Sequence, residues 1–113
     1  MKFNRYVALM LVALSGCTTV SDLRSNTPEV KGSSGMKPEQ FAACVSSRWK
    51  ASDVDFSYAP TEAGVEMVVG DSGYYHALLE AKRSGGGSDV ALHVRLPYGN
   101  SDVIAGVSDC LKR

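Results

Sequence analysis

The chain has 113 residues, which is enough for one small domain. Twelve basic residues balance twelve acidic ones, which argues against a nucleic-acid-binding protein because such proteins usually carry a basic excess on one face. The chain also has three cysteines, and in an exported protein an odd number leaves one thiol that needs a role of its own.

The N-terminal segment has the layout of an export leader. Lys2 and Arg5 form a positive region, and residues 6–14 form an apolar run. A run of about this length is typical of a signal peptide. A transmembrane helix needs about 20 apolar residues. We therefore expect a leader and not a membrane-spanning segment.

The leader ends in Leu14-Ser15-Gly16-Cys17, an aliphatic residue, two small residues and a cysteine. This motif resembles the lipobox of bacterial lipoproteins, and the resemblance covers residues 1–17 only. It implies that residues 1–16 are removed as a signal peptide and that Cys17 carries acyl chains, palmitate among them. Two or more chains anchor a protein stably, whereas one does so only marginally. Thr18 follows the cysteine in place of Asp, which implies the outer membrane, with the domain facing the periplasm.

The stretch after Cys17 predicts a tether. Residues 17–37 are rich in Ser, Thr, Gly and Pro, and residues 32–35 read Gly-Ser-Ser-Gly. A segment with so few large apolar residues cannot bury enough surface to fold alone. The alternative, an edge strand, has no alternating apolar pattern to support it. Loss of the leader leaves ten basic residues against twelve acidic ones, so composition offers no electrostatic reason to bind anionic lipid.

Two helices are predicted at the ends of the domain, which we place at residues 38–113. Residues 38–50 begin with a proline, which suits the first turn of a helix. Apolar residues at spacings of three and four give this segment one apolar face: Phe41, Cys44, Val45 and Trp49. Residues 101–112 show a similar stripe, and Asn100 or Ser101 is placed to cap that helix.

Alternating apolar and polar residues between the helices predict four strands. In residues 88–96 Leu92 and its alternate neighbours face one way, and a loop at residues 84–87 would place Leu79 opposite Leu92. A three-residue loop at 71–73, ending in glycine, would place Met67 opposite Ala77. Residues 54–59 supply the first strand. The prediction is an α+β domain in which a four-stranded antiparallel meander has an N-terminal and a C-terminal helix packed on one face.

The two cysteines of the domain are expected to pair. Cys44 and Cys110 each lie on the apolar stripe of a predicted helix, and the periplasm is oxidising. A bridge closing so long a loop is worth about 4 kcal/mol in the chain-entropy model. The alternative is two free buried thiols.

Residues with catalytic chemistry do not form a recognisable set in the sequence. His76 and His93 are both predicted on the outer face of the sheet, too far from other ligands to predict a metal site. Ser72 lies in Asp-Ser-Gly, but hairpin geometry explains that turn, and the glycines of residues 85–87 join two strands and do not open a helix. The sequence therefore predicts no catalytic residue, metal or cofactor.

The outer face of the predicted sheet is the remaining candidate site. It mixes apolar, aromatic and basic residues in the way that interaction surfaces do: Val68, Tyr74, His76, Leu78, His93 and Arg95. We therefore expect a non-enzymatic adaptor or inhibitor with an envelope protein as partner. Two alternatives stay open, a small periplasmic hydrolase and a carrier of a small apolar ligand.

Overall fold

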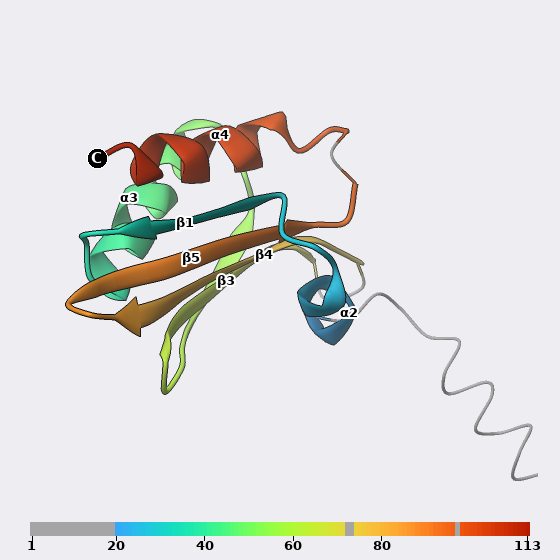
Figure 1. The fold of residues 1–113 in the computed structure, drawn as a ribbon. Coiled ribbons are helices and arrows are strands. Elements are labelled where there is room, and N and C mark those ends of the chain that lie inside the picture. The colour runs from blue at the N-terminus through green and yellow to red at the C-terminus, as the bar shows by residue number, and fades with distance from the viewer. Residues whose placement is uncertain (1–19, 72–73, 97) are drawn as a thin grey trace, which may run out of the picture.

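The structure is a computed structural model that describes residues 20–113 except 72–73 and 97 (Figure 1). The described chain forms an α+β domain built on one five-stranded antiparallel sheet. With the labels of Figure 1, its helices are α2 (Val20–Ser25), α3 (Pro38–Ala51) and α4 (Ser101–Leu111). Its strands are β1 (Val30–Ser34), β2 (Phe56–Pro60), β3 (Gly64–Asp71), β4 (Tyr74–Ser84) and β5 (Gly87–Val94).

The strand order is β1-β5-β4-β3-β2, so β2 to β5 form the predicted meander and β1 extends it at one edge. The four predicted strands are present, and the sheet has a fifth that was not predicted. Within the segment predicted as a tether, residues 20–25 form α2 and residues 30–34 form β1. β1 satisfies the backbone groups along the free edge of β5. Gly32 of β1 lies under Leu111 of α4, where a Cβ atom would stand 3.4 Å from Leu111 Cδ1. The small size of Gly32 thus lets α4 pack closely on β1, a role that the glycine-rich sequence did not indicate.

α3 and α4 cover one face of the sheet, called here the inner face (Figure 1). α3 begins at Pro38, and the Gln40 side chain accepts a hydrogen bond from the Lys37 backbone N–H. Phe41, Val45 and Trp49 are fully buried against alternate residues of the strands. The Trp49 indole N–H donates to the Val103 carbonyl, 3.1 Å away, which ties the two helices together.

A disulfide also joins these helices, as predicted. Cys44 of α3 and Cys110 of α4 are bonded, and their Cα atoms are 6.1 Å apart. Both residues pack in or against the core of the inner face. The cross-link therefore closes a loop that contains four of the five strands.

The register of the strands was predicted correctly for one hairpin and wrongly for the others. β4 and β5 pair as expected, with Leu79 opposite Leu92. Between β3 and β4, however, Met67 faces Leu79 and not Ala77, and β2 is displaced on β3 by the same two residues. The displacement of β3 on β4 has two sources of one residue each. Asp71, predicted in the loop, pairs with Tyr74, and a β-bulge follows between Val69 and Gly70, where Gly70 has a φ of 112°. A displacement by two keeps every side chain on its face, so the apolar pattern does not detect it.

Candidate interaction surface

The other face of the sheet, called here the outer face, holds the six residues predicted for partner binding. The register brings Val68, Leu78 and His93 side by side on β3, β4 and β5. Leu78 is fully buried, His93 is 5 % exposed and Val68 is half-buried. The prediction that Leu78 and His93 are exposed is therefore wrong, because α2 lies on this face and covers it.

α2 docks through one apolar and one charged side chain. Leu23 is fully buried on the sheet. Arg24 donates from Nε to Glu80 Oε2 at 3.1 Å and from Nη2 to Glu66 Oε1 at 2.5 Å. An isolated helix of six residues is not stable in water, so these contacts hold α2 in place.

Arg24 offsets the electrostatic repulsion between two neighbouring carboxylates. Glu66 and Glu80 lie directly opposite each other on β3 and β4, and Glu80 is only 8 % exposed. The hydrogen bond to Glu80 raises the pKa of Arg24 above its ordinary value, although desolvation opposes the rise. Because the folded-state pKa is raised, the contribution of the Arg24 proton to stability is present at neutral pH and is lost as the pH rises through that raised pKa, in strongly alkaline solution.

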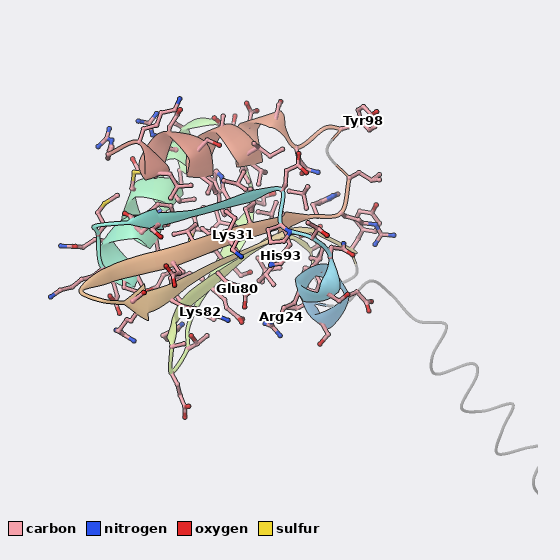
Figure 2. All side chains as sticks on the ribbon, in the orientation of Figure 1. Arg24, Lys31, Glu80, Lys82, His93 and Tyr98 are labelled. Carbon is pink, nitrogen blue, oxygen red and sulfur yellow. A yellow bond between two sulfur atoms is a disulfide. The ribbon has the colours of Figure 1, made fainter. Side chains whose placement is uncertain are left out.

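His93 completes the polar network beneath α2 (Figure 2). Its Nδ1 lies 2.8 Å from the Asn26 carbonyl oxygen, which can only accept, so Nδ1 carries the proton and donates. Its Nε2 lies 3.5 Å from Glu80 Oε1. Histidine and glutamate thus fix the end of α2 to the sheet. The sequence analysis missed Arg24 because this residue lies in the segment predicted as a tether. The apolar residues Val20 and Leu23, three positions apart, were the only indication of a short helix there.

The exposed remainder of the outer face is an aromatic and basic group at one end of β4 and β5. The rings of Tyr74 and His76 are 4.7 Å apart, edge to face. The Arg95 guanidinium carbon lies 4.4 Å from the centre of the Tyr74 ring, a cation–π contact. All three side chains are exposed, as predicted.

Two further apolar residues that the sequence did not single out belong to this group. Leu96 is 55 % exposed, and Tyr98 is 86 % exposed and projects from the loop before α4 (Figure 2). Together with Tyr74, His76 and Arg95 they line one shallow hollow. Asn100 is buried and donates from Nδ2 to the Leu96 carbonyl, 2.6 Å away, so its side chain braces the loop and does not cap α4. We call Tyr74, His76, Arg95, Leu96 and Tyr98 the tyrosine cluster.

A second hollow lies on the far side of the molecule, beside the disulfide. Its volume is about 390 Å³, and Cys44, Arg48 and Asp109 are among its lining residues. Arg48 and Asp109 form an ion pair across it at 3.2 Å. This hollow opens between the helices and not between the helices and the sheet, where an apolar ligand would be carried.

The described residues contain no group of three or more His, Cys, Asp or Glu side chains that could hold a metal ion. Within residues 20–113, leaving aside 72–73 and 97, no helix is long and apolar enough to cross a bilayer. The lipobox with Cys17, and Ser72 of the Asp-Ser-Gly turn, lie outside the described residues. Comparison with protein-family models, with curated proteins and with solved structures gives no match for this chain.

Proposed function

We propose that this protein is a lipid-anchored lipoprotein of the bacterial envelope whose domain is a non-enzymatic binding module, an adaptor or an inhibitor of another envelope protein. The lipobox at Leu14-Ser15-Gly16-Cys17 supports the anchor. Thr18, next to the acylation site, supports a place in the inner leaflet of the outer membrane, facing the periplasm.

The observation that carries the proposal is the position of α2. This helix begins at Val20, close behind Cys17, and it is fixed to the sheet by Leu23 and Arg24. The domain is therefore joined almost directly to its proposed anchor. Such a connection suits a module that must work at a set place on the membrane.

The use of the ionisable residues supports a non-enzymatic role. Glu66, Glu80 and His93 are the ionisable side chains of the outer face that lie beneath α2. Arg24 occupies both carboxylates, and the Asn26 carbonyl occupies the histidine. These contacts hold the fold together and leave the carboxylates and the ring little freedom to meet a substrate.

The anchor is tested in cells by blocking lipoprotein signal peptidase with globomycin, which should cause an uncut, heavier precursor to accumulate. Cys17→Ala should release the domain from the membrane fraction. Thr18→Asp is the matched control, because it should keep the lipid and move the protein to the inner membrane. A Cys17→Ala protein that is cut normally and stays in the membrane fraction would show that the lipobox interpretation is wrong.

The binding role is tested with photo-cross-linking residues placed one at a time at exposed positions over the whole domain, in intact cells. A binding module should give adducts with one envelope protein from adjacent positions that form a continuous surface. An enzyme or a ligand carrier would give no such protein adduct from any position, and that result would contradict the proposal.

A further inference from the structure

We infer that the tyrosine cluster docks into the headgroup layer of the membrane that carries the anchor, so that the domain meets the bilayer with the end of the sheet that carries α2 and the cluster. This inference rests on the proposed function in one respect, that Cys17 is acylated. The occupant of the cluster is a lipid surface, and four observations lead to it.

The first observation is the shortness of the connection. Only Thr18 and Thr19 separate Cys17 from Val20, and three residues span at most about 11 Å even when fully extended. Val20 begins α2, which is held to the outer face by Leu23 and Arg24. An acyl chain on Cys17 therefore brings α2, and the end of the sheet on which it lies, close to the bilayer (Figure 1).

The second observation is the position of the cluster at that same end of the sheet (Figure 2). His93 touches Asn26, the residue that directly follows α2. Arg95 and His76 each lie two residues further along the strands than His93 and Leu78, a step of about 7 Å. The cluster thus lies at the end of the sheet where α2 lies, and Tyr98 projects at that same end from the loop before α4 (Figure 2).

The third observation is the chemistry of the cluster. Tyr74, Leu96 and Tyr98 are three of the four exposed large hydrophobic residues among those that the structure describes. Tyrosine is enriched at membrane–water interfaces because its ring is apolar and its hydroxyl remains hydrated. Arg95 lies against the Tyr74 ring with its charge exposed, which suits contact with phosphate oxygens.

The fourth observation is the balance of charge around the cluster. Arg95 is its cation, and the acidic residue nearest in register is Asp71, which lies opposite Tyr74. Coulomb attraction to anionic lipid is therefore weak, and the docking depends on the side chains of Tyr74, Leu96 and Tyr98. The anchor holds these side chains at a high effective concentration beside the bilayer, so weak contacts suffice.

The test uses the full, acylated protein, purified from membranes and returned to vesicles of phosphatidylethanolamine and phosphatidylglycerol. One acyl chain of the lipid carries bromine atoms near its glycerol end, which quench a tryptophan in contact with the headgroup layer. The native Trp49 is fully buried in the inner core and provides a constant background.

Tyr98→Trp adds a reporter to the cluster, and Tyr58→Trp is the matched control. Tyr58 is also a tyrosine with an exposed side chain, 48 % exposed, but it lies on the edge strand β2 and outside the cluster. The brominated lipid should quench the emission that Tyr98→Trp adds and spare the emission that Tyr58→Trp adds. The quenching should change little between low and high salt, because its source is not electrostatic.

Several results would overturn the inference. Equal quenching at the two positions, or none at either, would show that the cluster does not face the lipid. A photo-cross-linking residue in place of Tyr98 that gives protein adducts and no lipid adduct in cells would assign the cluster to a protein partner.

Failure of the anchor is recognised separately, by mass spectrometry of the purified chain. If no acyl mass is present, the proposed function fails, and the chain is coupled to a maleimide lipid through the thiol of Cys17. The other two cysteines form the disulfide, so the coupling is specific. The same comparison of Tyr98→Trp with Tyr58→Trp then decides the docking.

Discussion

The two faces of the sheet are covered by different means. The inner face is closed by α3 and α4, two helices of 14 and 11 residues that share a continuous apolar core and a disulfide. The outer face is covered by the six residues of α2, which contribute Leu23 and the ion pairs of Arg24. One face is held by burial of apolar area and a covalent link, the other by a small polar network around one leucine. Stability should therefore come mainly from the inner face, whereas local opening should begin at the outer face.

The largest expected effect is on the inner face. Removing the disulfide with Cys44→Ala and Cys110→Ala together should lower the free energy of unfolding by about 4 kcal/mol. The physical reason is the freedom that the unfolded chain regains when the long loop is opened. Urea unfolding with and without the two substitutions measures the loss. A loss close to zero would mean that packing alone holds the two helices.

The next effect compares two neighbouring residues directly. Leu78 and Leu79 are both fully buried, one on each face of β4. Leu79→Ala opens a cavity in the main core and should cost about 3 kcal/mol, while Leu78→Ala should cost about 2 kcal/mol because α2 is free to shift into the space. Equal losses in urea unfolding would show that α2 is as rigid as the inner layer.

A smaller effect is expected from the charged contact of α2. Arg24→Ala leaves Glu66 and Glu80 facing each other and should cost about 1 kcal/mol. Amide hydrogen exchange should rise in α2 and in β1 while α3 and α4 keep their protection. Arg24→Ala combined with Glu66→Gln removes the repulsion and should recover part of the loss. Uniform exchange across the domain would contradict the idea of a locally held helix.

The smallest effect is expected in the tyrosine cluster. Tyr98 is 86 % exposed, so Tyr98→Ala should change the free energy of unfolding by less than about 0.5 kcal/mol. Thermal unfolding of the purified domain measures this. A larger loss would mean that the Tyr98 side chain supports the loop before α4, and the cluster would then be part of the fold and not a surface free to meet a membrane.

The difference between the faces also explains what the sequence could predict. Regular apolar spacing predicted the inner side of the strands, both long helices and the Cys44–Cys110 bridge. The glycine loop set the register of Leu79 and Leu92 correctly. The pairing of Asp71 with Tyr74 and the bulge at Gly70 together shifted Met67 by two residues, a change that leaves the pattern of faces intact.

The burial of the outer face could not be predicted from apolar spacing. α2 is too short for a periodic pattern, and its two contacts, Leu23 and Arg24, pair with residues far along the chain. The composition around them is that of a linker, so Leu78 and His93 were expected to meet solvent. Only the position of α2 on the sheet separates the buried residues of this face from the exposed tyrosine cluster.

The shortness of α2 has a mechanical consequence. Tension on the chain ahead of Val20 acts first on a helix held by one leucine and one guanidinium, whereas β1 behind it is secured by a ladder of paired residues on β5. Under a pull, α2 peels away before the sheet yields. Its six residues then lengthen from roughly 9 Å as a helix to about 20 Å as extended chain. We therefore expect the chain ahead of β1 to lengthen by about 11 Å under load while the disulfide-linked core stays folded.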